Sequence, residues 1–258
     1  MLTLFLQASV LILLAVFLLW IVSVILTNAS IVDIFWGFAF VLVNGFYFFS
    51  FDERHTRHLL VFILVTLWGL RLTFYLAWRN WGKGEDFRYR EFRQKYGPKR
   101  YWWISFFQTF LLQGILVMLV SLPLLSVQFK TQNTGLNFFD YAGMALWLIG
   151  FVFETGGDFQ LAHFKSNPRN KGKVLNTGFW RYTRHPNYFG DAAVWWGFAL
   201  FSVAASGYWQ IIGSLIMTLL LLKVSGVALL EKTLTETKPE YRDYVRKTRP
   251  FLPWFPKK

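Results

Sequence analysis

The chain of 258 residues contains no cysteine and only four histidines, and these shortages exclude several kinds of site. Without thiols there is no disulfide, no thiolate zinc site, no iron–sulfur cluster and no cysteine nucleophile. The histidines do not form the clustered boxes of membrane di-iron enzymes, so we expect no metal. No Gly-x-Gly-x-x-Gly motif follows a strand-like run, which argues against a nucleotide held by a Rossmann unit.

The composition is that of a membrane protein, because 55% of the residues are hydrophobic and 21% are aromatic. Apolar runs long enough to cross a bilayer recur along the chain, and helices satisfy their own backbone groups there. We therefore predict an all-α integral membrane protein with seven transmembrane helices in a single membrane domain, 1–258. The predicted spans are Leu4–Leu26, Ile31–Phe51, Leu59–Trp78, Ile104–Val127, Phe139–His163, Phe189–Ser206 and Tyr208–Leu230.

The positive charge predicts the orientation of these spans. Of the 27 Lys and Arg residues, 22 lie in the three segments 79–100, 165–184 and 232–258. Seven spans put the three segments on one side, and basic loops favour the cytoplasm. The N-terminus is then outside and the C-terminus cytoplasmic. Because the charge lies at membrane ends and not in a separate basic domain, we expect no nucleic-acid partner.

Two stretches outside the spans have a pattern of their own. The region Trp81–Trp103 mixes charged and aromatic residues, and it predicts a short amphipathic helix around Arg88–Tyr96 before Gly97-Pro98. The end of the chain, Pro250-Phe251-Leu252-Pro253-Trp254-Phe255-Pro256, has too many prolines for a regular helix. We expect this end to fold back on another part of the chain.

The most informative motif is Arg181-Tyr182-Thr183-Arg184-His185-Pro186-Asn187-Tyr188-Phe189-Gly190-Asp191. Pro186 suits the first position of a helix, and free backbone N–H groups beside Arg181 and Arg184 make an anion site. Asn187 and Asp191 are four residues apart and share a face of that helix. The motif predicts a phosphate-bearing ligand at the membrane surface. The alternative is a basic loop that binds lipid headgroups.

Ionisable groups inside predicted spans are costly and are functional candidates, although they can also pair to hold a bundle together. They are Asp33, Arg71, Glu154, Asp158, Asp191 and Lys223. Glu154 and Asp158 lie one helical turn apart and repel each other unless a donor-rich ligand or a cation lies between them. Lys165 and Arg169 follow towards the cytoplasm. This gradient suits a nucleotide whose phosphates face the cytosol.

Several motifs together resemble a known family. The run from Arg184 to Asp191, followed by Trp195-Trp196-Gly197, resembles the C-terminal motif of steroid 5α-reductases, sterol double-bond reductases and, more loosely, isoprenylcysteine carboxyl methyltransferases. The other matching segments are Lys83-Gly84-Glu85-Asp86-Phe87-Arg88-Tyr89, Gly157-Asp158-Phe159-Gln160, Asn176-Thr177-Gly178-Phe179-Trp180, Tyr241-Arg242-Asp243-Tyr244 and Phe251-Leu252-Pro253. The ensemble resembles a bacterial-type member of the steroid 5α-reductase family, which would lie in the inner membrane of a bacterium.

The resemblance implies NADPH as the cofactor and reduction of the C4–C5 double bond of a 3-oxo-Δ4-steroid. It implies substrate-side helices in 1–130 and NADPH-binding helices and tail in 131–258. Asp158, Lys165, Asn187 and Asp191 occupy the family's cofactor-contacting positions. The full predicted cofactor set is Asp86, Arg88, Tyr89, Glu154, Asp158, Lys165, Arg169, Arg181, Tyr182, Arg184, His185, Asn187, Tyr188, Asp191, Trp195, Lys223 and Tyr241.

Enone reduction also needs a group that polarises the substrate ketone. Asp33 is the best match to the family's catalytic Glu, and Tyr75 is the tyrosine nearest to the expected position. We expect Asp33, desolvated by neighbouring aromatic residues, to stay protonated as a donor. Trp36 and Trp68 are predicted to line the substrate pocket.

Three alternatives remain open: a sterol double-bond reductase, a membrane methyltransferase that uses S-adenosylmethionine, and a non-enzymatic protein that binds lipid or sterol. The methyltransferase cofactor has no phosphates and needs fewer cations than the basic loops offer. A lipid-binding protein leaves the paired acids unexplained. We expect a monomer that is embedded in membrane lipid and takes a steroid or sterol-like substrate.

Overall fold

The computed structural model describes residues 1–131, 135–224 and 239–257, and these ranges form helices, turns and loops without strands. The chain forms two compact units. Unit 1 comprises Met1–Leu136 with Ala205–Gln210, and unit 2 comprises Asn137–Ala204 with Ile211–Lys258. The all-helical character predicted from the apolar runs is therefore confirmed for the described residues.

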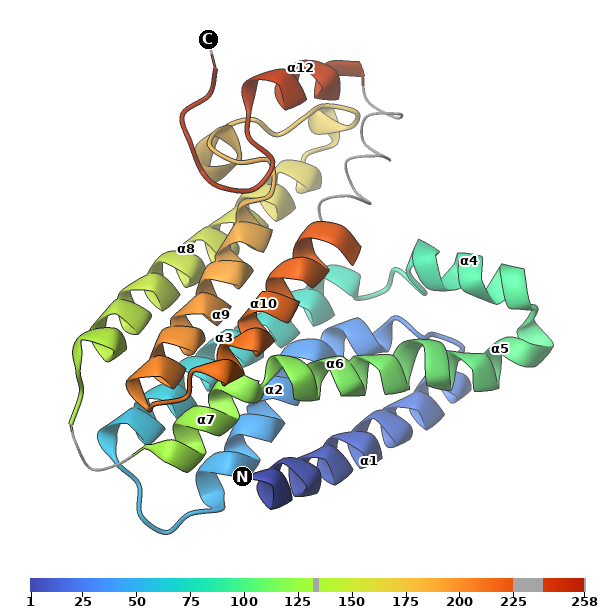
Figure 1. Ribbon diagram of the computed structural model, residues 1–258. Coiled ribbons are helices and arrows are strands. Elements are labelled where there is room, and N and C mark those ends of the chain that lie inside the picture. Colours follow the sequence, from blue (N-terminus) through green and yellow to red (C-terminus); the bar gives the residue numbers. More distant parts are fainter. Residues whose placement is uncertain (132–134, 225–238, 258) are drawn as a thin grey trace. The chain divides into compact units, whose positions relative to one another are not determined.

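Unit 1 is built around three long apolar helices, α1 (Leu2–Leu26), α2 (Ile31–Phe49) and α3 (Thr56–Asn80) (Figure 1). A short helix, α4 (Phe87–Tyr96), confirms the predicted amphipathic helix in this region. The chain then runs through α5 (Pro98–Ser105), the π-helical turn η1 (Phe106–Leu111) and α6 (Leu112–Val120), and it ends in α7 (Leu122–Lys130).

Close packing between α2 and α3 depends on two glycines that face each other. A Cβ atom on Gly37 would lie 2.4 Å from the Gly69 carbonyl oxygen, and one on Gly69 would lie 2.6 Å from that of Gly37. Beside this crossing, the Phe40 ring lies 5.3 Å from the Trp36 ring and 5.8 Å from the Trp68 ring. The two predicted pocket tryptophans thus pack on one core phenylalanine, and Trp68 is fully buried.

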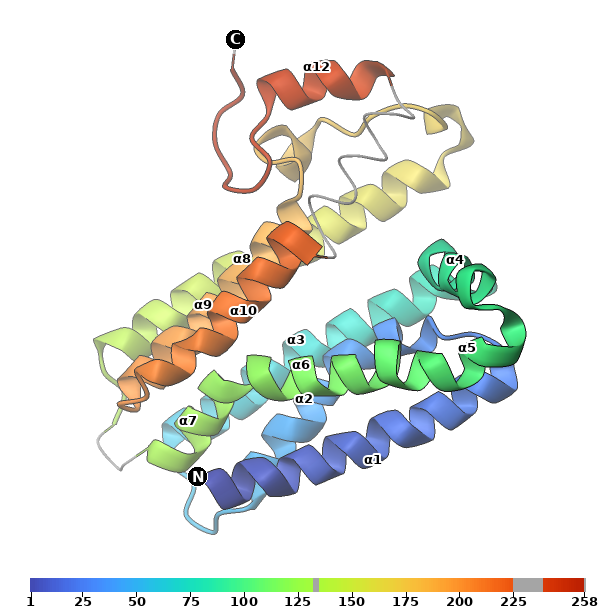
Figure 2. The same cartoon turned by 45° about the vertical axis from the view of Figure 1, so that its right-hand side comes forward.

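Unit 2 consists mainly of α8 (Phe138–Ser166), α9 (Pro186–Ala204) and α10 (Ile212–Leu219), which lie side by side (Figure 2). The short turns η2 (Pro168–Asn170) and η3 (Gly178–Arg181) lie between α8 and α9. The turn η4 (Trp209–Ile211) precedes α10, η5 (Leu220–Val224) follows it, and α12 (Pro239–Lys247) lies near the C-terminus. Pro186 begins α9, as its missing N–H predicts.

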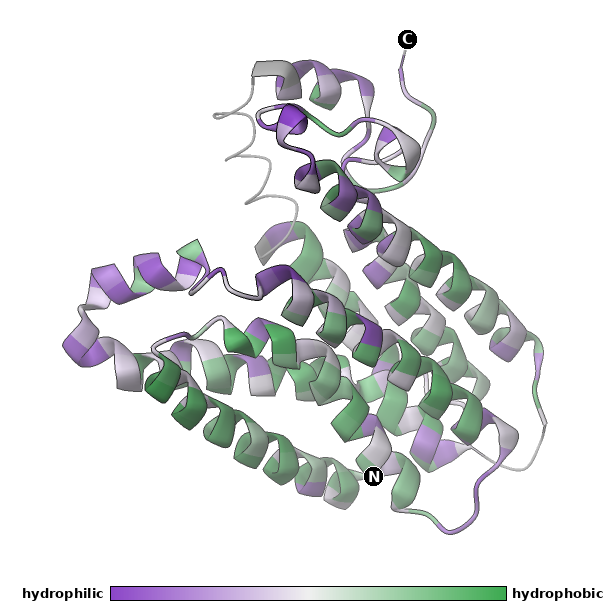
Figure 3. Cartoon of the chain, turned by 180° about the vertical axis from the view of Figure 1, so that it is seen from behind, coloured by the Kyte–Doolittle hydropathy of each residue, from purple (hydrophilic) through white to green (hydrophobic). Residues whose placement is uncertain are grey.

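Within the described residues, five helical stretches are long and apolar enough to cross a membrane: Leu2–Leu26, Ile31–Phe49, Thr56–Asn80, Pro98–Val120 and Phe138–Ser166. Figure 3 shows the hydrophobic colouring that runs along these helices, in contrast to the polar α4. The protein is therefore a multi-pass membrane protein. The predicted orientation of the termini stays a prediction.

The predicted count of seven spans is not confirmed. The sixth prediction coincides with α9, which has 19 residues but does not belong to the five. Its polar Asn187 and Asp191 and its burial against α8 distinguish it from a lipid-facing helix. The seventh begins as the short apolar helix Trp209–Lys223, and its last predicted residues lie outside the described ranges. The fourth span begins earlier than predicted and ends at Val120, because α7 starts a separate helix with Pro123 in its first turn.

Candidate functional site

Glycines on α8 and α9 bring the predicted cofactor residues of unit 2 together. Gly143, Gly150 and Gly157 recur every seven residues along α8 and face α9. A Cβ on Gly150 would lie 2.6 Å from the Gly190 carbonyl oxygen, and one on Gly190 would lie 2.3 Å from the Glu154 backbone nitrogen. The two backbones approach so closely that short polar side chains reach across the interface.

Asp158 and Asn187 form the polar centre of this interface. The Asn187 Nδ2 atom of α9 donates a hydrogen bond to Asp158 Oδ1 of α8 at 3.1 Å. Glu154 and Asp158 are only 3% and 5% exposed, and Asp191 is buried one turn beyond Asn187. The buried Oδ1 atom of Asn187 has no hydrogen-bond partner within the described residues. The site therefore combines buried carboxylates with an amide acceptor, and it can receive a donor-rich ligand.

The loop before α9 lies over the C-terminal turns of α8. The backbone N–H of Phe179 donates to Gln160 Oε1 at 3.0 Å, and the Trp180 indole donates to the Gly157 carbonyl at 3.1 Å. The Phe179 ring lies flat against Gly156, where a Cβ would clash at 2.3 Å. Gln160 and Trp180 were not among the predicted site residues, although both lie in the motifs that carry the family resemblance.

Arg184 holds the C-terminal segment in place. Its buried guanidinium donates from Nη1 to the carbonyls of Val245 and Thr248, at 2.9 Å and 2.7 Å. Its backbone N–H donates to the Arg249 carbonyl at 2.9 Å. These carbonyls end α12, where a cation stabilises the helix C-terminus. The predicted phosphate contact of this arginine stays a prediction, while its guanidinium binds two backbone carbonyls.

The end of the chain folds back on the same loop, as its proline content predicts. The Trp254 backbone N–H donates to the Tyr182 carbonyl at 2.9 Å. Thr183 Oγ1 donates to the Phe251 carbonyl at 2.8 Å, and the Tyr244 hydroxyl donates to the Trp180 carbonyl. The motif at residues 181–191 is thus braced by α8 on one side and by the C-terminal segment on the other.

The remaining predicted cofactor residues of unit 2 differ in their exposure to solvent. Arg169 and Arg181 are exposed and have no carboxylate partner within the described residues, so they are available to an anion. Lys165 and Lys223 are also exposed. The His185 ring stacks on the Tyr188 ring at 5.5 Å, and the Tyr182 ring meets that of Phe255. Trp195 and Tyr241 are buried, and Tyr241 packs against Tyr244.

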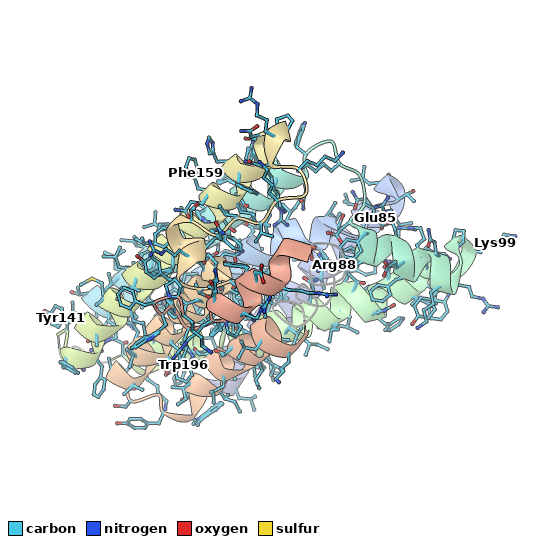
Figure 4. The ribbon with its side chains drawn as sticks, turned by 90° about the horizontal axis from the view of Figure 1, so that it is seen from above. Glu85, Arg88, Lys99, Tyr141, Phe159 and Trp196 are labelled. Atoms are coloured by element: carbon cyan, nitrogen blue, oxygen red, sulfur yellow. The ribbon has the colours of Figure 1, made fainter. Side chains whose placement is uncertain are left out.

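Three predicted cofactor residues, Asp86, Arg88 and Tyr89, lie in unit 1 and converge on Asp33. The Tyr89 hydroxyl donates to Asp33 Oδ1 at 2.7 Å, and Arg88 Nη2 donates to Oδ2 at 2.7 Å. Arg88 also donates from Nε to Asp86 Oδ1 at 2.9 Å, and Asp86 caps α4 through the Arg88 backbone N–H. The network fastens α4 to the start of α2, and Figure 4 marks Arg88 and Glu85 at this end.

Proton positions in this network follow from its charges. Burial and the nearby Asp33 carboxylate raise the pKa of Tyr89 well above its usual range, so the phenol stays protonated. Burial alone would lower the pKa of Arg88, but hydrogen bonding to Asp86 and the charge of Asp33 raise it above the ordinary value. Burial opposes ionisation of Asp86, yet its hydrogen bonds with Arg88 lower its pKa. Asp33 accepts one hydrogen bond from each of Arg88 and Tyr89, and its predicted role as a proton donor stays a prediction.

The hydroxyl that reaches Asp33 belongs to Tyr89 and not to Tyr75. Tyr75 lies on α3 among cations, with the guanidinium carbons of Arg71 and Arg79 at 5.4 Å and 5.7 Å from its ring centre. The sequence reasoning also missed Glu85, which receives two hydrogen bonds from Arg93, at 3.0 Å and 2.8 Å, and one from the Ala29 N–H at 2.8 Å. The available signal was its place in the segment Lys83–Tyr89, which carries part of the family resemblance.

Comparisons with known proteins agree with a reductase-like relationship. The chain is 28% identical to the uncharacterized protein C594.04c of Schizosaccharomyces pombe over 91% of its own length and 75% of that protein. It is 35% identical to the 3-oxo-5-alpha-steroid 4-dehydrogenase 1 of Mus musculus over 65 residues, which is 25% of this chain and 26% of the mouse protein. The Bos taurus protein of the same name is 33% identical over 66 residues, 26% of each chain.

These partial similarities suggest a membrane oxidoreductase, while the aligned part spans only about a quarter of each steroid dehydrogenase. No solved structure matches the chain. A family model described as a protein of unknown function (DUF1295) matches residues 19–248. Because this match covers most of the sequence, the chain belongs to the DUF1295 family.

Proposed function

We propose that this protein reduces the C4–C5 double bond of a 3-oxo-Δ4-steroid, or of a closely similar enone lipid, with NADPH as the cofactor. The observation that carries the proposal is the hydrogen-bonded pair Asp158–Asn187, set between glycine-packed helices below a basic loop. The partial similarity to 3-oxo-5-alpha-steroid 4-dehydrogenases supports the reaction type.

The donor set of unit 2 fits the two chemical ends of a dinucleotide. Glu154 and Asp158 are buried acceptors for ribose hydroxyls, and the Asn187 amide can both accept and donate. Arg169 and Arg181 are exposed cations for phosphate, with Lys165 at the same end of α8. NADPH would supply the hydride when bound. The residues of this chain would orient it and neutralise its phosphates.

In unit 1 the Asp33–Tyr89 pair suits a ketone-polarising role. Tyr89 keeps its proton because burial and the Asp33 charge raise its pKa. Its single O–H donates to Asp33 at 2.7 Å, which holds the hydroxyl in place, and on substrate binding this O–H would turn from Asp33 to the developing oxyanion. This assignment replaces Tyr75 by Tyr89 as the proposed catalytic tyrosine, and it gives Asp33 the role of an orienting acceptor.

The cofactor part of the proposal is tested by titrating the purified protein in detergent with NADPH and, separately, with S-adenosylmethionine. Quenching of tryptophan fluorescence reports binding. We expect NADPH to bind and Asn187→Ala to weaken it by roughly 10–150-fold, the usual effect of losing a hydrogen bond that involves a charged group. Asn80→Ala, at the end of α3 in unit 1, is the control and should bind NADPH like the wild type.

Saturable binding of S-adenosylmethionine without binding of NADPH would reject the reductase and favour the methyltransferase. If neither cofactor bound, the lipid-binding alternative would be favoured. If NADPH bound equally well to wild type and Asn187→Ala, the nucleotide would not lie at the Asp158–Asn187 pair.

A further inference from the structure

A second site is indicated in unit 1, within the stretch Pro98–Val120 that is long enough to cross a membrane. Its helix is interrupted by the π-helical turn η1, and π-helical turns inside α-helices often occur at functional sites. Gln108 lies in this turn. The Oε1 atom of Gln108 is buried and has no hydrogen-bond partner within the described residues. An amide oxygen without a hydrogen-bond partner is energetically costly in a membrane-spanning helix, and a bound ligand that completes the pairing of the amide would remove this cost.

Gln108 faces an open groove of about 560 Å³ on the surface of unit 1. The other lining residues are Tyr96 at the end of α4 and Trp103, Ile104 and Phe107 on α5 and η1. Trp103 and Phe107 are 45% and 58% exposed, which leaves their apolar surface available. Aromatic side chains of this kind gather where a membrane meets water.

Cations lie next to the groove residues along the chain. Lys95, Lys99 and Arg100 are exposed and form no ion pair with a residue that the structure describes. Lys99 projects away from the helices (Figure 4). By contrast, Arg88 and Arg93 on α4 are already paired with carboxylates. The unpaired cations nearest in sequence to the groove residues are therefore Lys95, Lys99 and Arg100.

The order of these residues along one helix face matches the layers of a lipid. Arg100, Trp103, Ile104, Phe107 and Gln108 follow the helical spacing of three and four residues. Gln108 lies roughly 12 Å along the axis from Arg100, at about 1.5 Å per residue. The interfacial layer of a bilayer is about 5–8 Å thick on each side. With Arg100 at phosphate level, the Gln108 backbone lies roughly 4–7 Å below this layer, and its side chain, which leans back towards the start of the helix, reaches up towards the ester linkages.

We propose that this groove binds an anionic glycerophospholipid. Lys99 and Arg100, together with Lys95, hold the phosphate, and Trp103 and Phe107 pack along one acyl chain. A turn of the Gln108 amide exchanges its oxygen and nitrogen, so it can donate to an ester carbonyl. The proposal concerns unit 1 alone and does not depend on the proposed reductase activity.

Native mass spectrometry of the full chain, released from detergent with added phosphatidylglycerol or phosphatidylcholine, tests this site. Wild type is expected to retain phosphatidylglycerol preferentially. The double variant Lys99→Ala/Arg100→Ala should lose roughly 10–30-fold in affinity for phosphatidylglycerol, since it removes the electrostatic attraction of two basic residues to an anionic headgroup. Gln108→Leu, which removes the amide at similar size, should weaken retention of both lipids.

Two matched controls belong to the same experiment. Arg90→Ala removes an exposed cation of α4 that does not line the groove, and Gln113→Leu makes the same amide-to-leucine change in α6. Both should retain lipid like the wild type. Equal retention of the two lipids by wild type would overturn the proposal. A loss in Lys99→Ala/Arg100→Ala with unchanged binding in Gln108→Leu would also overturn it, because surface charge alone would then account for the lipid.

Discussion

Arg181 and Arg184 are three residues apart in one motif, but their surroundings differ. Arg181 is exposed and has no carboxylate partner within the described residues. Arg184 is buried, and its guanidinium contacts the carbonyls of Val245 and Thr248. A cation that is already bound to backbone carbonyls contributes to holding the chain together, while an exposed one can meet a phosphate.

The two arginines should therefore respond differently to the same substitution. Arg181→Ala is expected to raise the NADPH dissociation constant by roughly tenfold or more, because it removes a charged hydrogen-bond donor, and to leave the melting temperature unchanged. Arg184→Ala is expected to lower the melting temperature, because buried carbonyls of α12 lose their donor. Nucleotide titration and thermal unfolding on the same samples measure both quantities. An unchanged melting temperature in Arg184→Ala would contradict the bracing role.

Tyr89 and Asp33 allow a second comparison at this scale. Tyr89→Phe keeps the ring but removes the hydroxyl donor, and we expect turnover of an enone to fall by roughly 10²-fold or more with little change in NADPH affinity. Asp33→Asn should retain more activity than Asp33→Leu, because an amide still accepts a hydrogen bond from the phenol. Tyr75→Phe is the matched control and should turn over normally.

If Tyr75→Phe lost activity while Tyr89→Phe kept it, the sequence-based assignment of Tyr75 would be correct. The sequence analysis placed Tyr89 in the cofactor set, because no local pattern shows that it contacts Asp33, which is 56 positions away in the chain. In contrast, Asp158 and Asn187 were predicted as one group, since each lies in a recognisable motif and the structure joins them directly.

The interface between α8 and α9 is the element that organises unit 2. Glycines at seven-residue intervals allow the helices to approach so closely that an added methyl group has no space. The sequence predicted both helices and the start of α9 at Pro186, but not their contact. Recognising that contact requires knowing which faces of the two helices meet, and that depends on tertiary packing.

Gly190→Ala tests this packing. The new Cβ would lie 2.3 Å from the Glu154 nitrogen and 2.5 Å from the Gly150 carbonyl oxygen, both backbone atoms that cannot turn aside. We expect a loss of stability of about 1–3 kcal/mol or more, typical of overpacking, and weaker NADPH binding. Gly45→Ala on α2 is the control, since its nearest neighbour would be 3.9 Å away.

A wild-type melting temperature in Gly190→Ala, measured by thermal unfolding in detergent, would show that α8 and α9 can separate without cost.

The prediction of α4 from its mixed charged and aromatic pattern was more secure, because an N-cap and a helical period are local features. Its attachment to Asp33 through Arg88 and Tyr89 is not local and was not foreseen.

At the scale of the whole molecule, the described residues include five helices long and apolar enough to cross a membrane, and the chain belongs to the DUF1295 family. Hydropathy predicted these five because lipid-facing helices are apolar all round. The sixth predicted span coincides with α9, which is not among the five, and it stays a prediction. The ambiguity between burial in protein and contact with lipid affects any count made from sequence.

The most direct test of the reductase assignment is transfer of label from NADPH deuterated at the nicotinamide C4 position to a 3-oxo-Δ4-steroid, followed by mass spectrometry. The account predicts a saturated ketone that carries one deuterium at the former β-carbon. Formation of this labelled ketone should fall in Tyr89→Phe, and in Asn187→Ala when the NADPH concentration is limiting. An unlabelled product, or no reduction of any enone by protein that binds NADPH, would contradict the account.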